Sequence, residues 1–358
     1  MTKKLSILQV GDFRFSYYDF ELFNALRSSD KFRVVDKFSW SQYFNDYKYE
    51  NFFEKLYYGC MNRYKIGPVI NRINSDLIDV VEKGNYDVVF LWRAIHIKKS
   101  TLNEIKKKVI IVGYNNDQTQ STHHPWWVFW RLKDSLQSYD HFFSYRSIDV
   151  DYLKGKGVSS SLFIPTVNIE RIYPKQIPSE KSYEVAFIGH YENDGRDELI
   201  LNLLRAGYKV RLNGQRWSLS PLYQELKSFV GKIEPVYDGY NDALNSSLIC
   251  LSLLSKLNQD TYTRRTLEIP ATRSLMLAEF SDEQANMFNP GTEAVYFSSK
   301  EECIDLVKNL LSDKTKLHKI AASGYAKFVV GPYSMENRVD DIVKVTKKFR
   351  RIRLYDEK

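Results

Sequence analysis

The segment Thr261–Glu279, TYTRRTLEIPATRSLMLAE, carries the residues on which the interpretation of this chain depends most. Its pattern predicts a short helix that begins near Arg264 and Arg265 and is followed by a buried strand. Glu268 comes three and four residues after the arginines, so the helix brings the three side chains together. Arginines at a helix start suit phosphate oxygens, and one carboxylate can accept both hydrogen bonds of a ribose diol. The alternative is a surface helix with an Arg–Glu ion pair and no ligand.

On both sides of this segment, short apolar runs alternate with longer amphipathic stretches, a pattern that indicates βαβ units and parallel sheets. The first series of predicted strands is Leu5–Val10, Phe32–Phe38, Asp87–Trp92, Val109–Tyr114, His141–Tyr145 and Ser161–Ile164. The second series is Glu184–Ile188, Lys209–Leu212, Leu248–Leu254, Leu275–Phe280 and Ala294–Phe297. Predicted helices between the strands include Val69–Glu82, Trp126–Ser138, Glu198–Ala206 and Glu301–Leu311.

The stretch Pro165–Ser182 separates the two series, and its three prolines make it the best candidate for a linker. We therefore expect an α/β protein of two doubly wound, Rossmann-like domains that face each other across a cleft. Ligands are expected at the carboxyl ends of the strands. The expected boundaries are 1–165 for the first domain, 166–182 for the linker and 183–332 for the second domain. Residues 333–358 are expected to form a C-terminal helix and basic tail that packs back on the first domain.

Composition agrees with a folded protein of two domains, because 358 residues are about twice the roughly 100–200 residues of one domain. With 43% hydrophobic and 27% charged residues, a largely disordered chain is excluded. Aromatic residues reach 15%, which predicts a large core and an aromatic-lined cleft. The apolar runs are far shorter than the ~20 residues of a membrane span, and none forms a signal peptide. Widely spaced Cys60, Cys250 and Cys303 fit a reducing cytoplasm rather than a disulfide framework or a zinc site.

The net charge of +8 favours an anionic partner without identifying it. Much of the excess lies in Val343–Arg353, VKVTKKFRRIR, which has six basic residues and no acidic one. One interpretation of this tail is the solvated face of a helix over Arg338–Phe349. The other is peripheral contact with anionic membrane lipids.

Four motifs follow one another in the C-terminal third of the chain: RTLEIPA at Arg265–Ala271, PGTE at Pro290–Glu293, Ser312-Asp313, and Pro332-Tyr333-Ser334 with Arg338. In this order they resemble the C-terminal domain of GT-B glycosyltransferases, in particular the CgeB-like branch related to glycosyltransferase family 4. That branch reads R-x-F-E-I-P-A-C-G before a strand, then a P-G-x-E turn, a helix with Asp near its end, and H-x-Y-x-x-R. Weaker similarity extends upstream through residues 183–245 and 139–173.

The resemblance implies that Glu268 binds the ribose of a nucleotide-sugar donor. The neighbouring Arg264, Arg265 and Thr266 are then expected to contact the donor nucleotide, with the arginines on its diphosphate. The sequence departs from the family pattern at Leu267, where Phe is usual, and at Arg273, where glycine is usual. An arginine at the second position either clashes with the donor or supplies a phosphate contact.

A second donor contact is expected in VAFIGHYENDGRDE, residues 185–198, where a strand ends in Gly189 and Arg196 begins a helix. In GT-B enzymes the first loop of the C-terminal domain faces the donor phosphates. The plainer interpretation is a glycine that only makes a turn. The loop Asn213–Arg216 is a weaker candidate for the same surface.

Candidates for a general base come from the first domain, and they are Asp117, Asp12 and His123. Asp12 follows the first strand, while Asp117 and His123 follow the fourth. We prefer Asp117, because the family tends to carry an acidic residue there. The alternative is that both aspartates are helix caps or turn residues. The cluster Trp126, Trp127 and Trp130 is either a packed helix start, a sugar-stacking surface or a lipid contact.

Other enzyme signatures are missing, including a P-loop, GxSxG and HExxH. Asp149-Val150-Asp151 fits a D-x-D pattern but lies in a predicted helix, so we expect no metal and no cofactor beyond the nucleotide-sugar co-substrate. The resemblance implies a cytoplasmic, metal-independent, hexosyltransferase-like enzyme of bacterial surface polysaccharide synthesis. It would move a sugar from a nucleotide diphosphate to a hydroxyl of a glycan or polyprenyl-linked acceptor. Two alternatives stay open, a sugar-nucleotide epimerase and a non-catalytic GT-B-like binding or scaffold protein; we expect no nucleic-acid partner.

Overall fold

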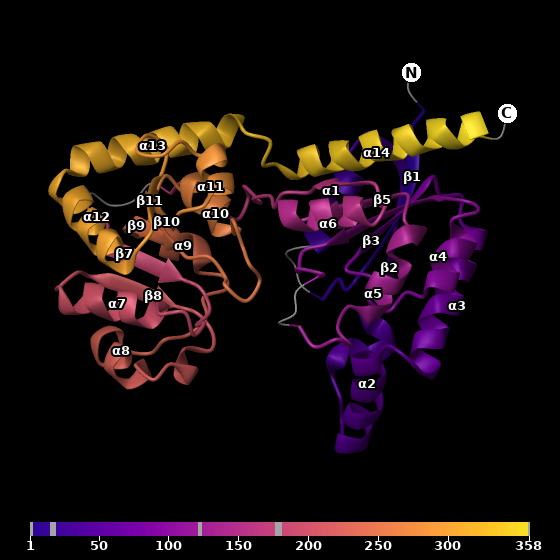
Figure 1. The fold of residues 1–358 in the computed structure, drawn as a ribbon, viewed down its shortest axis with the longest axis horizontal. Coiled ribbons are helices and arrows are strands. Elements are labelled where there is room, and N and C mark those ends of the chain that lie inside the picture. The colour runs from indigo at the N-terminus through magenta and orange to yellow at the C-terminus, as the bar shows by residue number, and fades with distance from the viewer. Residues whose placement is uncertain (1–2, 15–18, 121–123, 176–180, 357–358) are drawn as a thin grey trace. The chain divides into compact units, whose positions relative to one another are not determined.

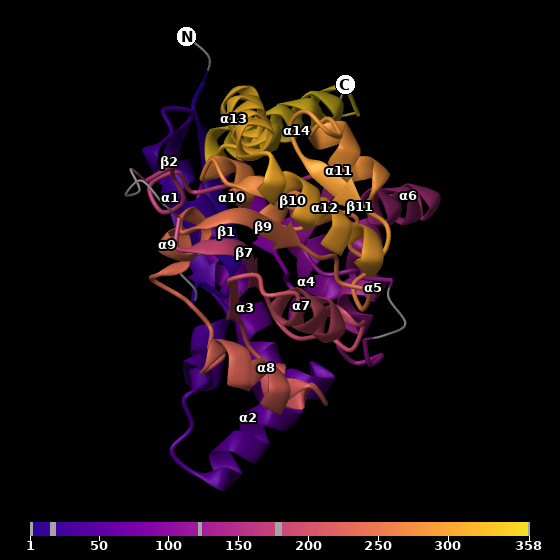
Figure 2. The same cartoon turned by 90° about the vertical axis from the view of Figure 1, so that its left-hand side faces the viewer.

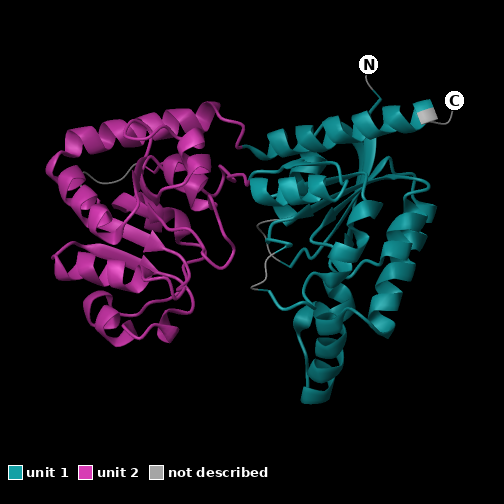
Figure 3. Ribbon diagram, in the orientation of Figure 1, with its two compact units in different colours: residues 1–164, 334–358 teal, residues 165–333 magenta. Residues whose placement is uncertain are grey.

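The computed structural model of the chain describes residues 3–14, 19–120, 124–175 and 181–356 (Figures 1 and 2). The chain forms two compact units, shown in Figure 3. Unit 1 comprises residues 1–164 and 334–358, and unit 2 comprises residues 165–333. Of the expected linker, residues 176–180 lie outside the described residues. Its first part belongs to unit 2, where the backbone N–H groups of Tyr173 and Lys175 donate to the side chains of Asn241 and Asn245.

Unit 1 is built on a parallel sheet with the strand order β2-β1-β3-β4-β5-β6. The strands are β1 (Leu5–Gly11), β2 (Phe32–Ser39), β3 (Val88–Trp92), β4 (Ile110–Asn115), β5 (His141–Ser144) and β6 (Ser160–Leu162). The helices are α1 (Asp19–Ser28), α2 (Phe52–Tyr64), α3 (Pro68–Lys83), α4 (Lys99–Ile105), α5 (Trp130–Ser135), α6 (Ser147–Gly155) and α14 (Met335–Asp356).

The core of unit 1 follows from its apolar periodicity. Every residue of β1 is buried, as expected for a central strand covered on both faces. In α3 the buried positions Ile70, Ile73, Leu77 and Val81 recur at three- and four-residue intervals, so one stripe of the helix packs on the sheet.

The C-terminal helix α14 packs on α1 and β4 of unit 1. Val339, Ile342 and Val343 are buried on its inner side. Two of its basic side chains form ion pairs with unit 1, Arg350 with Asp87 at 2.9 Å and Arg353 with Asp140 at 2.8 Å. Part of the basic tail therefore serves to hold the helix on the body of unit 1.

Unit 2 is built on a second parallel sheet, with the strand order β11-β10-β9-β7-β8. The strands are β7 (Tyr183–Ile188), β8 (Val210–Asn213), β9 (Ser247–Ser252), β10 (Leu275–Glu279) and β11 (Val295–Phe297). The helices are α7 (Arg196–Arg205), α8 (Tyr223–Val230), α9 (Tyr240–Asn245), α10 (Arg265–Ala271), α11 (Asp282–Met287), α12 (Lys300–Ser312) and α13 (Lys314–Val330).

The prediction of two doubly wound α/β domains is confirmed, and each predicted strand agrees with the structure to within two residues at either end. Each sheet has a switch point, where strand order reverses: between β1 and β3 in unit 1, and between β7 and β9 in unit 2. Ligands of such sheets bind beyond the carboxyl ends of these strands. Within the described residues, no helix combines the length and the apolar character that crossing a membrane requires.

Candidate functional site

Arg265 bridges the two strands at the switch point of unit 2. Its Nη2 donates to the carbonyl oxygen of Leu253 at 2.8 Å, just past the end of β9. Its Nη1 donates to the carbonyl oxygen of Ile188, the last residue of β7, at 3.4 Å. The buried Nε has no hydrogen-bond partner among the described residues. The structure thus places a guanidinium at the position where a doubly wound sheet binds its ligand.

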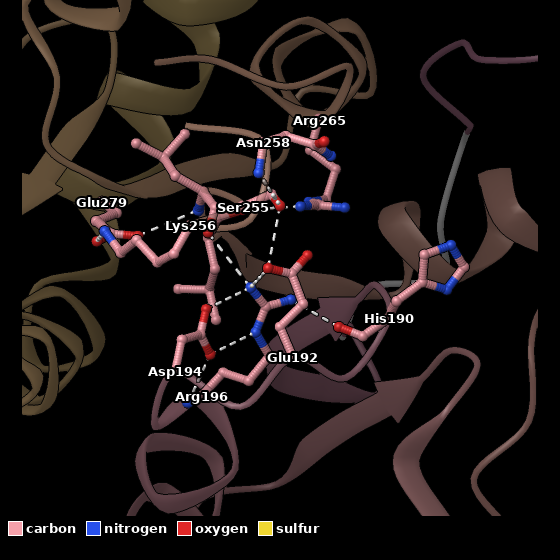
Figure 4. Close-up of polar contacts among 11 residues, drawn as sticks. His190, Glu192, Asp194, Arg196, Ser255, Lys256, Asn258, Arg265 and Glu279 are labelled. Atoms are coloured by element: carbon pink, nitrogen blue, oxygen red, sulfur yellow. Dashed lines mark hydrogen bonds and ion pairs between the residues drawn. The ribbon is translucent and has the colours of Figure 1, made fainter. Parts of the chain in front are cut away.

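Arg196 braces the loop that follows β7 (Figure 4). Its side chain is buried and forms a bidentate pair with Asp194 at 2.8 and 2.6 Å. It also donates to the carbonyl oxygens of His190 at 2.6 Å and Leu254 at 3.3 Å, which joins the loops after β7 and β9. All three guanidinium nitrogens are therefore engaged by the protein. The sequence suggests a phosphate contact for Arg196. The observed geometry fits a role in shaping the loop better than it fits that contact.

The same two loops are tied by further polar contacts. Glu192 accepts a hydrogen bond from the Ser255 hydroxyl at 3.0 Å, and Glu279, at the end of β10, accepts one from the backbone N–H of Leu254 at 3.1 Å. Lys256 pairs with the other oxygen of Glu279 (Figure 4). The carboxyl ends of β7, β9 and β10 are thereby fixed relative to one another.

Glycine is required where the loops after β7 and β8 touch. A Cβ on Gly189 would lie 2.7 Å from the ring of Phe187 and 3.2 Å from Nη1 of Arg265. A Cβ on Gly214 would lie only 1.8 Å from the carbonyl oxygen of Gly189, which also accepts a 3.0 Å hydrogen bond from the Trp217 indole. Gly189 therefore permits close backbone packing as well as any approach of a ligand.

His190 and Arg216 lie beside this edge, and Arg216 adds to its positive charge. Both are exposed, and they follow β7 and β8, respectively. The pKa of His190 is lowered, first by partial desolvation and then by the positive charges of Arg265 and Arg216. From the sequence we singled out Gly189 and did not consider His190. The position of His190 just after a predicted strand could have indicated it.

Glu268 lies in the first turn of α10 with 7% of its surface exposed. One carboxylate oxygen accepts a hydrogen bond from the Tyr240 hydroxyl at 2.8 Å, and the other accepts one from Nε of Arg264 at 3.1 Å. Burial and the nearby carboxylate raise the pKa of Tyr240 well above its ordinary value, so this hydroxyl stays a donor. Each carboxylate oxygen has a second lone pair, which leaves acceptor capacity for a bound diol.

Two residues expected to contact the nucleotide, Thr266 and Arg273, make contacts within the protein. The hydroxyl of the fully buried Thr266 donates to Gln284 at 2.7 Å and accepts from the backbone N–H of Thr263, so it is engaged within the protein. Arg273 follows the end of α10 and precedes β10, at the opposite edge of the sheet from Arg265. Its guanidinium lies 4.3 Å from the ring centre of Tyr325. Its φ of 57° is a conformation that glycine adopts without strain, which explains why glycine suits this position.

In unit 1, two predicted carboxylates lie beyond the carboxyl ends of the strands. Asp12 follows β1 and forms a bidentate pair with Arg14 at 2.5 and 2.7 Å. Asp117 follows β4 and pairs with Arg93, the residue after β3, at 2.9 Å. The third candidate base, His123, lies outside the described residues.

Asp149 is a buried carboxylate that the interpretation of the sequence set aside. It lies in the first turn of α6, after β5, with 2% of its surface exposed. Neither carboxylate oxygen has a hydrogen-bond partner among the described residues, and the Arg146 guanidinium is 4.0 Å away. Burial raises the pKa of Asp149 to about 6. The positive charge of Arg146 lowers this pKa, and the negative charge of Asp117 raises it. The D-x-D pattern at 149–151 was the signal for it in the sequence.

Comparison with known proteins supports this assignment of the fold. Residues 196–344 match the family model described as "Glycosyl transferase-like". Sucrose-phosphate synthase from Thermosynechococcus elongatus superimposes with a TM-score of 0.67 at 9% identity, covering 98% of this chain and 100% of that one. Anabaena HepE in complex with UDP and glucose gives a TM-score of 0.64 at 9% identity, covering 96% and 100%. The fold is GT-B.

The GT-B fold is shared by proteins with different activities. A putative UDP-N-acetylglucosamine 2-epimerase from Listeria monocytogenes superimposes with a TM-score of 0.56 at 12% identity, covering 98% of this chain and 97% of that one. No curated protein is detectably related to the sequence. Because one fold supports different activities, the chemistry at the candidate site depends on its own side chains.

Proposed function

We propose that the chain is a nucleotide-sugar glycosyltransferase whose donor binds at the carboxyl edge of the sheet in unit 2. The observation that carries this proposal is the pair formed at α10, with Arg265 across the switch point and the Glu268 carboxylate one turn away. The glycosyltransferase-like match supports the proposal because residues 196–344 contain both side chains. The UDP and UDP-glucose complexes of HepE, a protein of the same fold, point to the same ligand class.

The proposed roles follow from charge and hydrogen-bonding capacity. Glu268 accepts hydrogen bonds from the ribose hydroxyls, held in place by Tyr240 and Arg264. Arg265, with the exposed Arg216 near it, forms the positive surface for the diphosphate. The CgeB-like branch and its relation to glycosyltransferase family 4 stay predictions of the sequence.

The proposed reaction breaks the bond between the anomeric carbon of the sugar and the diphosphate oxygen. The bond electrons leave with the nucleoside diphosphate, whose growing negative charge the cationic side chains stabilise. We propose that these cations serve in place of a metal ion and that the sugar is a hexose. Among the described residues, no three His, Cys, Asp or Glu side chains are grouped closely enough to hold a metal ion. Metal independence remains a proposal for experiment.

The acceptor is proposed to be a hydroxyl of a glycan or lipid-linked glycan of a bacterial surface polysaccharide, used in the cytoplasm. A general base in unit 1 removes the hydroxyl proton as the oxygen bonds to the anomeric carbon. Asp117 is the preferred base, with Asp12 and His123 as the alternatives. Arg93 holds the Asp117 carboxylate, which also lies near the buried Asp149.

Incubation with UDP-glucose and with other sugar nucleotides, with and without a polyprenyl-linked glycan, tests the proposal. The wild-type protein should release the nucleoside diphosphate and form a glycosylated product. Glu268→Ala should abolish release, while Glu225→Ala, which removes an exposed ion pair with Arg205 in the same unit, should not. Conversion of the sugar on its nucleotide without an acceptor would instead favour an epimerase, the alternative that the Listeria protein raises. Nucleotide binding without any conversion would favour a non-catalytic protein.

A further inference from the structure

Helix α2 of unit 1 turns its apolar side toward solvent. Of its residues only Met61 is buried. Phe52 and Phe53 expose 71% and 80% of their surface, and Leu56 and Tyr57 expose 52% each. In α3, by contrast, the apolar stripe is the buried one. In Figures 1 and 2 α2 stands out from the rest of unit 1.

The exposed apolar side chains form one continuous face. At about 100° per residue, positions 52, 53, 56, 57, 60 and 64 fall on a single side of the helix. Tyr64 is 40% exposed and Ile66, just past the helix end, is 55% exposed. Core formation cannot explain this pattern, because the face has no covering element among the described residues.

The tryptophan cluster extends this face. Trp130 donates its indole hydrogen to the carbonyl oxygen of Tyr64 at 3.1 Å, and Arg63 lies over the ring of Trp127 at 4.3 Å. The neighbouring Trp126 is 67% exposed. We call this set the α2 surface, and it consists of Phe52, Phe53, Leu56, Tyr57, Tyr64, Ile66 and Trp126.

The charges beside the α2 surface suit an anionic layer. Lys55 and Arg63 are exposed on α2, and the exposed Lys48 and Glu50 that precede the helix offset each other. The Glu54 carboxylate is turned to the helix start, where it accepts hydrogen bonds from Asn45 at 2.7 Å and from the backbone N–H of Glu50 at 2.9 Å. The whole chain carries a net charge of +8. Helices that lie in the membrane interface combine Phe, Leu and Trp with neighbouring Lys and Arg.

We infer that the α2 surface docks the protein on an anionic lipid bilayer. A second copy of the chain is a poorer occupant. A bilayer needs no matching groove, so a convex helix can insert its aromatic side chains directly.

The C-terminal tail, for which membrane contact was one of two interpretations of the sequence, is not needed for this docking. The tail helix α14 is packed on unit 1, and Arg350 and Arg353 are paired with unit 1 carboxylates. A docked α2 surface deepens the proposed function, because it brings unit 1 to a layer that contains lipid-linked acceptors. Vesicle binding needs no substrate, so the docking inference and the transferase proposal can fail separately.

Co-sedimentation with vesicles of equal parts phosphatidylcholine and phosphatidylglycerol tests the inference. We expect the wild type to bind, and the double variant Phe52→Ser/Phe53→Ser to bind about tenfold more weakly, because two exposed aromatics no longer enter the bilayer. The matched control is Val329→Ser/Val330→Ser, which removes two exposed apolar residues of unit 2. It should bind like the wild type, as should the tail variant Lys347→Gln/Lys348→Gln/Arg351→Gln.

Equal binding by Phe52→Ser/Phe53→Ser and the wild type would overturn the inference, as would a wild type that does not bind vesicles. Greater loss in the tail variant would return the contact to α14. Light scattering tests whether a second copy of the chain occupies the α2 surface instead. A wild type that is a dimer, with a double variant that is a monomer, would assign the surface to a second copy. Unchanged circular dichroism of the double variant establishes that weaker binding does not reflect unfolding.

Discussion

Tyr240 donates its phenolic hydrogen to the carboxylate of Glu268 at 2.8 Å. The two residues belong to α9, which precedes β9 in the chain, and α10, which follows it, so this bond links the two helices that flank β9 in the sequence. The contact fixes one oxygen of Glu268 from one direction while Arg264 fixes the other. A carboxylate held in this way presents its remaining lone pairs at a constant angle, which is what a ribose-binding group requires.

Tyr240→Phe should weaken nucleotide binding without unfolding the protein. The phenyl ring keeps the packing and removes only the hydroxyl that positions Glu268. Loss of one hydrogen bond to a charged group corresponds to about 1.5–3 kcal/mol. Calorimetric titration with the nucleotide that binds the wild type measures the effect. Unchanged affinity would show that Tyr240 does not position the nucleotide site.

Arg265→Lys should loosen the switch point of unit 2. Lysine keeps the charge but cannot donate to the carbonyl oxygens of both Ile188 and Leu253 with one planar fork. We expect the free energy of unfolding to fall by about 1–3 kcal/mol in urea denaturation. Arg205→Lys, at an exposed ion pair, serves as the control and should change it by less than about 1 kcal/mol. Equal effects of the two substitutions would contradict a bridging role.

Gly214→Ala should be strongly destabilising. Its Cβ would lie 1.8 Å from the Gly189 carbonyl oxygen, and the φ of 153° is one that side chains rarely adopt. A loss of about 3 kcal/mol is expected from overpacking and backbone strain. Gly59→Ala, in α2 with no atom within 4 Å of the new Cβ, should instead stabilise by about 0.5–1 kcal/mol. Thermal unfolding compares the two, and a mild effect at Gly214 would contradict the described contact of the loops.

Asp149→Asn should change how stability depends on pH. The pKa of Asp149 is about 6 in the folded protein against an ordinary value of 3.8. Between these values the folded state holds more protons than the unfolded chain, so the free energy of unfolding falls as pH rises. The variant lacks this titration and should gain up to about 3 kcal/mol relative to the wild type from pH 4 to pH 6.

The difference between the two proteins is the quantity to measure in the Asp149 experiment. Buried His141, whose pKa burial lowers to about 4, opposes the effect in both proteins, because its stabilising contribution is lost as pH falls. Subtraction removes this shared contribution. A constant difference across the interval would show that the Asp149 carboxylate is not held in a desolvated site.

The strands could be predicted from the sequence because their residues form apolar runs with turn residues between them. Buried parallel strands such as β1 and β3 leave this signal without any knowledge of the partner strands. The outward face of α2 could not be predicted in this way. High aromatic content led to the expectation of a large core and an aromatic-lined cleft, yet Phe52 and Phe53 are among the most exposed side chains. The spacing of apolar residues shows which side of a helix is apolar. It does not show whether another element covers that side.

The candidate site was predictable by region and less so by side chain. The sequence correctly brought Arg264, Arg265 and Glu268 into one helical turn. It could not show that the Arg196 guanidinium is fully engaged by the protein, because one of its acceptors, the carbonyl oxygen of Leu254, lies 58 residues further along the chain. Hydrogen-bond satisfaction depends on the tertiary structure, which residue spacing does not report.

Thermal unfolding with UDP, GDP, dTDP and CMP tests whether unit 2 binds a nucleotide through Glu268. At about 100 times its dissociation constant, a bound nucleotide stabilises the fold by about 2.7 kcal/mol, a readily measured rise in Tm. We expect one nucleoside diphosphate to raise the Tm of the wild type and of Glu225→Ala but not of Glu268→Ala. A wild type that responds to none of them, or a Glu268→Ala variant that responds equally, would contradict this expectation.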